Sequence, residues 1–134
     1  MSVTQGNSMR PSIMAGAVLQ FKKDKEHIAV GDVIAFIGDD GTMAAHRVIE
    51  ITRNPETVFT TQGDSVACAE QVPQSAVIGV VDRVEYSHFS YSADGPAGRF
   101  FKNMALGKKL RWRIAKRAVR RALYIYQQIK HYLN

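Results

Sequence analysis

The sequence predicts an α+β protein that is mainly β, with a small, antiparallel, coiled or barrel-like sheet followed by a helical tail. Two observations support this fold class. Short apolar segments separated by Gly and Asp turns occupy most of the first 90 residues, as in compact antiparallel sheets. After residue 98 the apolar residues recur at helical spacing instead.

The predicted strands follow one another closely along the chain. Gly38-Asp39-Asp40-Gly41 is typical of a hairpin turn, and it joins two of these strands. Asn54-Pro55 and Gly63-Asp64 end two others. The predicted strands are residues 17–21, 33–37, 42–52, 58–62 and 77–84.

Residues 99–133 predict one long helix, or two shorter helices if Gly107 interrupts it. Apolar residues at 106, 110, 114, 118, 122, 125, 129 and 133 follow the helical period. The turn-rich segment Ser92-Ala93-Asp94-Gly95-Pro96-Ala97-Gly98 precedes them. We therefore predict a β-domain over 1–91, a linker over 92–98 and a basic amphipathic tail over 99–134.

The net charge of +6 is unevenly distributed. Residues 1–98 hold seven Lys and Arg and all twelve acidic residues, whereas residues 99–134 hold eleven Lys and Arg and no acid. Such a division indicates a separate functional surface in the tail. We expect peripheral contact with an anionic membrane, or docking on the acidic domain or on a second copy as an oligomer. Nucleic-acid binding through phosphates and stacking is a less favoured reading.

Ser8 and His46 are the candidate catalytic residues. Ser8 lies among turn-forming residues, between Gly6-Asn7 and Pro11, where backbone N–H groups can face a substrate carbonyl. A serine nucleophile needs a base within hydrogen-bond reach, and histidine titrates near neutral pH. His46 lies on a predicted strand. A carboxylate would orient its imidazole, and Asp64 is the first candidate and Glu70 the second.

The order of these motifs resembles the signal peptidase family of serine endopeptidases, which shares its fold with the self-cleaving repressor peptidases. His46-Arg47-Val48 is similar to the base-bearing motif of the archaeal and endoplasmic-reticulum branch, which uses histidine where other members have lysine. The similar segments cover roughly residues 5–84 in the family's order: Gly6–Gly16, Gly31–Ile34, His46–Val48, Thr61–Asp64 and Val77–Val81.

The resemblance implies a serine endopeptidase that cleaves a peptide or protein precursor after small residues, without a metal or cofactor. It also makes Met9 and Ile13 candidates to line the substrate pocket. Many members have a hydroxyl residue two positions before the nucleophile, where this chain has Gly6. The alternative function is a catalytically inactive β-domain that binds a membrane surface or nucleic acid through its tail.

Composition adds expectations about location and about metal sites. Only seven residues precede Ser8, and no run of 18 apolar residues occurs, so we expect a cytoplasmic protein that can lie on the inner face of the membrane. Cys68 is the single cysteine, and His27, His88 and His131 show no ligand spacing, so we expect no zinc site.

Overall fold

The structure is a computed structural model that describes the backbone of residues 2–3 and 6–133, and the side chains of residues 6–108 and 117–132. The chain forms two units, Met1–Asn103 and Met104–Asn134. The first unit contains the sheet and the first two turns of a helix, and the second consists of the rest of that helix.

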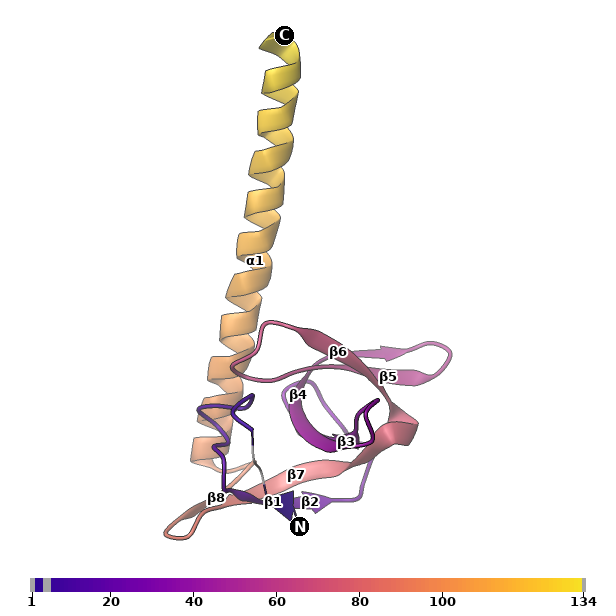
Figure 1. Ribbon diagram of the computed structural model, residues 1–134, viewed down its shortest axis with the longest axis vertical. Coiled ribbons are helices and arrows are strands. Elements are labelled where there is room, and N and C mark those ends of the chain that lie inside the picture. Colours follow the sequence, from indigo (N-terminus) through magenta and orange to yellow (C-terminus); the bar gives the residue numbers. More distant parts are fainter. Residues whose placement is uncertain (1, 4–5, 134) are drawn as a thin grey trace. The chain divides into compact units, whose positions relative to one another are not determined.

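An antiparallel sheet forms the first unit, and it coils on itself (Figure 1). The strand order is β1-β2-β7-β3-β4-β5-β6, with β8 paired to β7, and every pairing is antiparallel. This confirms the predicted α+β, mainly β, fold class. The strands are β1 (Ser2–Val3), β2 (Val18–Lys22), β3 (Val33–Ile37), β4 (Met43–Arg53), β5 (Thr57–Gln62), β6 (Ala69–Pro73), β7 (Val77–Glu85) and β8 (Ser90–Ser92).

The five strands predicted from apolar patterning correspond to β2, β3, β4, β5 and β7, within one residue at each end. The hairpin turn between β3 and β4 is also confirmed, because Gly41 has a φ of 80° and the Gly38 amide donates to the Thr42 carbonyl at 2.8 Å. Strands β1, β6 and β8 were not predicted. The side chains of β6 are exposed except for Val72, so β6 lacks the apolar alternation that reveals a strand.

Two apolar clusters form the core of the first unit. The larger one joins β3, β4, β5, β6 and β7 and contains Ile28, Ile34, Phe36, Val48, Phe59, Val72 and Val77. The smaller one contains Met9, Ile13, Ala17, Leu19, Val81 and Val84. Its first two members come from the N-terminal turn region, so burial of their side chains fixes that region against β2 and β7.

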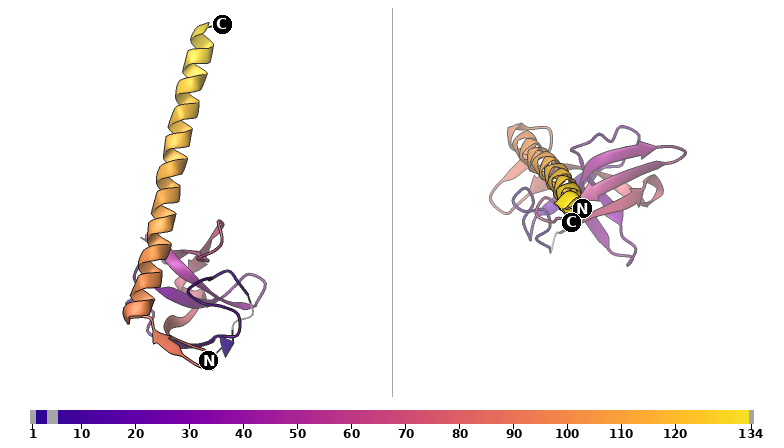
Figure 2. Two further views of the ribbon diagram at one scale, coloured as in Figure 1. Left: turned by 90° about the vertical axis from the view of Figure 1, so that its left-hand side faces the viewer. Right: turned by 90° about the horizontal axis from the view of Figure 1, so that it is seen from above.

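Helix α1 (Pro96–Leu133) runs without interruption through Gly107 (Figure 2). Of the two arrangements predicted for the tail, the single long helix is therefore the one observed. Proline suits the first helical position, because its ring fixes φ and the missing N–H would have no helical partner there. The segment predicted as a linker contains the end of β8, a turn and the first residues of α1. In the part of the chain that the structure describes, no helix combines the length and hydropathy needed to cross a membrane.

Candidate active site

His46 lies on β4, which pairs with β3 on one side and, from Arg47 onward, with β5 on the other. It pairs with Ile34 of β3, and its ring meets that of Phe36 in a T-shaped arrangement with 5.8 Å between the ring centroids. The side chain is only 18% exposed. A strand held on both sides has little freedom, so the imidazole has a fixed position.

Ser8 belongs to a tight turn that starts at Asn7. The Arg10 amide donates to the Asn7 carbonyl at 3.2 Å, and the Ile13 amide donates to the Met9 carbonyl at 3.0 Å. This turn places the Ser8 Oγ 3.1 Å from the His46 Nε2, although the two residues are 38 positions apart. The structure therefore brings the two candidate catalytic residues into hydrogen-bond contact.

The loop after β5 supports the Ser8 turn from behind. The Ser65 amide donates to the Ser8 carbonyl at 2.9 Å, and the Ser65 hydroxyl donates to the Asn7 carbonyl at 2.7 Å. Gly63 packs so closely here that an added Cβ would lie 2.5 Å from the Ser8 carbonyl oxygen. Glycine is thus required at position 63 by space, because a side chain would displace the serine.

Glu70 is the carboxylate that contacts His46. It lies on β6, opposite Thr61 of β5, and its Oε1 contacts the His46 Nδ1 and accepts from the Thr61 hydroxyl at 3.2 Å. A carboxylate only accepts hydrogen bonds, so Nδ1 carries the proton when His46 is neutral. The lone pair of Nε2 then faces the Ser8 hydroxyl.

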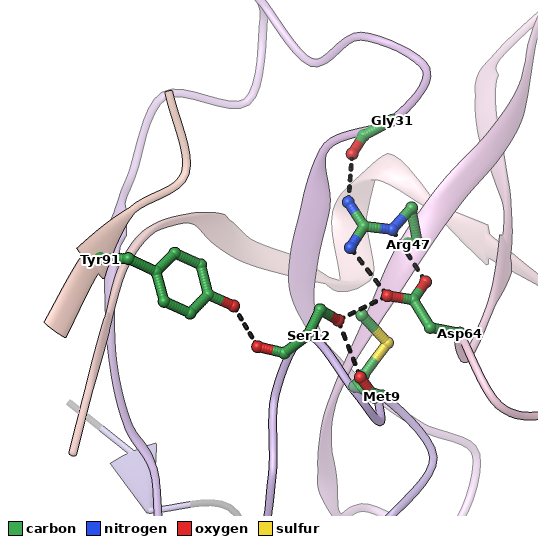
Figure 3. Close-up of polar contacts among 6 residues, drawn as sticks. All are labelled: Met9, Ser12, Gly31, Arg47, Asp64 and Tyr91. Carbon is green, nitrogen blue, oxygen red and sulfur yellow. Dashed lines mark hydrogen bonds and ion pairs between the residues drawn. The ribbon is translucent and has the colours of Figure 1, made fainter. Parts of the chain in front are cut away.

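Asp64, the first candidate for that orienting role, lies in a different network (Figure 3). The Arg47 guanidinium donates to both Asp64 carboxylate oxygens at 2.8 Å, and its remaining nitrogen donates to the Gly31 carbonyl at 2.8 Å. The Ser12 hydroxyl lies 2.5 Å from the Asp64 Oδ2 and 2.7 Å from the Met9 carbonyl. The bidentate pair is buried, with 5% of the Arg47 side chain and 3% of the Asp64 side chain exposed.

Tyr91 closes this buried network on the side of β8. Its hydroxyl donates to the Ser12 carbonyl, as Figure 3 shows. Burial is the main cause that raises the pKa of Tyr91 well above its ordinary value, and the neighbouring Tyr86 adds to it. The phenol therefore stays protonated and remains a donor to the turn that follows Ser8.

Met9 and Ile13, the candidates to line a substrate pocket, are both buried in the smaller core cluster, 4% and 3% exposed. Their side chains pack against residues of β2 and β7. In this structure they hold the Ser8 turn onto the sheet.

Sequence reasoning assigned no role to Arg47, Ser12, Thr61 or Ser65, which position the candidate site residues. For Arg47, the sequence does contain a pattern from which its role could have been inferred. Successive side chains of a strand point to opposite faces, so Arg47 points to the face opposite His46, and an arginine that is buried there requires a carboxylate. The contacts of Ser12 and Ser65 depend on loop packing and leave no pattern in the sequence. Among the described residues, no group of three or more His, Cys, Asp or Glu side chains is arranged to hold a metal ion.

Comparison with known proteins gives a partial match. The chain is 36% identical over 77 residues to signal peptidase I W of Bacillus subtilis, and this stretch covers 55% of the chain but 40% of that relative. No protein-family model matches the sequence, and no solved structure matches the fold. The match supports a signal-peptidase-I-like relationship over part of the chain.

Proposed function

We propose that the protein is a serine endopeptidase in which Ser8 is the nucleophile, His46 the general base and Glu70 the orienting carboxylate. The observation that carries this proposal is the line of contacts from the Ser8 Oγ through both His46 ring nitrogens to the Glu70 carboxylate. A nucleophile, a base and a group that orients the base are the three parts that such catalysis needs. The contacts run from the nucleophile to the base and from the base to the orienting carboxylate, which is the order that such catalysis requires.

In the proposed reaction, the Ser8 Oγ attacks the carbonyl carbon of the scissile peptide bond while its proton passes to the His46 Nε2. The separation of 3.1 Å is within the range for proton transfer by a general base. Glu70 stabilises the imidazolium that forms. His46 then protonates the leaving amine, which departs and leaves an acyl-enzyme on Ser8. Water, activated by the same imidazole, releases the acid and restores the serine.

The oxyanion of the tetrahedral intermediate needs a hydrogen-bond donor. Within the described residues, no hydrogen bond uses the backbone N–H of Ser8. We assign this N–H to the oxyanion, because preorganised donors are a major source of rate enhancement in acyl transfer. Position 6 is glycine, so no side-chain hydroxyl supplements the backbone there.

The substrate in this proposal is a peptide or protein precursor, cut after a small side chain. The resemblance of the Ser8, His46 and Asp64 segments to signal peptidases implies this preference. The use of histidine as the base favours the histidine branch of that family. The chain spans about 40% of the length of the relative it matches. The substrate and the location of the protein are therefore proposed here.

A peptide library read out by mass spectrometry tests the proposal. The library varies the residue before the cut from glycine and alanine to leucine and phenylalanine. We expect the wild-type protein to cut after small residues, and we expect Ser8→Ala and His46→Ala to lose nearly all cleavage. Loss of either member of such a unit removes most of the catalysis.

Ser87 and His88 provide matched controls, because both are exposed in the turn between β7 and β8. The variants Ser87→Ala and His88→Ala make the same chemical changes away from the site and should cleave like the wild type. Cleavage that persists in Ser8→Ala would refute the proposed nucleophile. A folded wild-type protein that cuts no peptide of the library and no signal-peptide precursor would favour the non-catalytic alternative.

A further inference from the structure

The exposed part of α1 has two chemically different sides. Between residues 117 and 132 every side chain is exposed, including Val119, Leu123 and Ile129, each more than half exposed. A single helix cannot bury its own apolar side chains, so this apolar surface needs a partner.

The two sides follow from the spacing of about 100° per residue along a helix. The apolar residues lie on one side, and Lys130 lies at the boundary of that side. The polar side carries three arginines together with Tyr124, Gln127, Gln128 and His131. The apolar side consists of Ala118, Val119, Ala122, Leu123, Ile125, Tyr126, Ile129 and Tyr132, and the arginines are Arg117, Arg120 and Arg121. The unbroken helix keeps both sides in register over the whole segment.

Charge distinguishes three external partners that could cover this surface: a second copy of the helix, a nucleic acid and a lipid surface. Eleven Lys and Arg and no acidic residue lie in 99–134. Paired helices normally place opposite charges beside their apolar seam, and a second copy of this helix would bring only like charges there. A nucleic acid would neutralise the cations through its phosphates but would leave the aliphatic side chains in water. An anionic lipid surface satisfies both sides at once, with headgroups for the cations and the acyl boundary for the apolar residues.

We propose that residues 117–132 form a peripheral anchor that binds in the plane of an anionic lipid bilayer. Tyr126 and Ile129 lie near the middle of the apolar side and enter the acyl boundary, with Leu123 and Ile125 on its flanks. Tyr132 lies at headgroup level. Arg117, Arg120 and Arg121 pair with lipid phosphates. Lys130 extends its charged end from the boundary to the headgroups. This anchor does not depend on the proposed peptidase activity.

Sedimentation of the full chain with vesicles tests the proposal. One set of vesicles is phosphatidylcholine alone, and the other contains phosphatidylcholine and phosphatidylglycerol at 3:1. We expect binding to the anionic vesicles only, and we expect it to weaken as salt rises because exposed charges are screened.

Two variants separate the contributions of the two sides. Arg117→Gln/Arg120→Gln/Arg121→Gln should lower the partition coefficient on anionic vesicles by about 100-fold, since each cation contributes roughly fivefold at such a surface. Leu123→Gln/Ile129→Gln should lower it by at least about tenfold. Circular dichroism checks that both variants keep the helix, as expected for exposed positions with good helix formers.

Lys22→Gln/Lys23→Gln/Lys25→Gln is the matched control. It removes the same net charge from the first unit and should bind vesicles like the wild type. Ser8→Ala should also bind like the wild type, which separates failure of the anchor from failure of the catalytic proposal.

Four results would overturn the anchor. The wild-type protein could bind both kinds of vesicle equally, or it could bind neither. Either helix variant could bind as well as the wild type, or the lysine control could lose as much binding as the arginine variant. If the wild-type protein binds neither kind of vesicle, two further measurements identify the partner. Binding of a fluorescent single-stranded oligonucleotide that is lost in the arginine variant would assign the helix to nucleic acid. A dimer seen by light scattering and lost in Leu123→Gln/Ile129→Gln would assign it to a second copy.

Discussion

His46 and Arg47 are neighbours on β4, yet each belongs to a different polar network with its own carboxylate. His46 contacts Glu70, whose side chain is 45% exposed, whereas Arg47 pairs with Asp64, whose side chain is 3% exposed. The alternation of side chains along a strand separates the two networks by only one residue. The His46–Glu70 network is open to solvent, whereas the Arg47–Asp64 network is buried.

This difference assigns different tasks to the two carboxylates. A buried charge must keep its partner, because separation of the pair leaves an uncompensated charge in a medium of low polarity. The Arg47–Asp64 pair is therefore fixed, and together with Ser12 it holds the residues behind Ser8 in place. Glu70, in contrast, is partly exposed and contacts the His46 Nδ1. We infer that Glu70 orients His46 in the proposed reaction and that Asp64 stabilises the fold around Ser8.

The largest expected effect separates two serines of the same turn region. Ser8→Ala should lower kcat/KM by roughly 10³- to 10⁶-fold, because the proposed nucleophile is lost. The free energy of unfolding should stay within about 0.5 kcal/mol of wild type, because the hydroxyl is half-buried and packs little. Ser12→Ala should do the opposite, keeping measurable cleavage while losing about 1–3 kcal/mol of stability, because buried Asp64 loses a donor. Peptide cleavage and urea unfolding measure the two effects, and the inference fails if Ser12→Ala proves the more damaging to cleavage.

The next effect concerns stability alone. Arg47→Met should destabilise the fold by about 3–5 kcal/mol, because Asp64 remains buried without its partner. Arg53→Met, at the exposed end of the same strand, is the control and should be close to neutral. Arg47→Met/Asp64→Leu should regain much of the loss, since an apolar pair can replace a buried ion pair. Urea unfolding would contradict this view if the double variant were less stable than the single one.

Glu70→Gln should have an intermediate effect, on activity rather than on stability. Loss of a hydrogen bond to a charged group costs about 1.5–3 kcal/mol, which corresponds to about a 10- to 100-fold lower kcat/KM. Glu56→Gln, exposed in the turn between β4 and β5, is the control. If Asp64 rather than Glu70 oriented His46, Glu70→Gln would cleave peptides at the wild-type rate.

A smaller effect is expected at the loop that supports the Ser8 turn. Ser65→Ala removes the hydroxyl that donates to the Asn7 carbonyl but keeps the amide that donates to Ser8. We expect a loss of about 0.5–1.5 kcal/mol in stability, with a several-fold lower kcat and an unchanged KM. A change in KM alone would show that Ser65 contacts substrate and does not position the nucleophile.

The smallest effect concerns an exposed pair outside both networks. The hydrogen bond that His27 donates to the Asp24 carboxylate raises the pKa of His27, and the negative charge of Asp24 adds to this. Since the folded-state pKa lies above the unfolded value, the stabilisation is present below the unfolded pKa and is lost as pH rises through the folded one. NMR titration of Asp24→Asn should show the pKa of His27 falling toward its ordinary value. An unchanged titration would show that this contact is not maintained in solution.

The sequence by itself determined the sheet's main strands, the hairpin at Gly38–Gly41, the basic helix and the candidates Ser8 and His46. Apolar alternation, turn residues and the segregation of charge are local properties, so they can be read without a fold. It did not reveal β6, because exposed polar side chains on an edge strand leave no apolar pattern.

Only the tertiary structure decided between Glu70 and Asp64 as the residue in contact with His46. The choice depends on the pairing of β5 with β6, which sets Glu70 opposite Thr61, and on the depth at which Arg47 is buried. Strand register and burial arise from contacts between distant segments, and spacing along the chain does not specify them. The same holds for Gly63 and Ser65, whose close contact with Ser8 exists only after the sheet has folded.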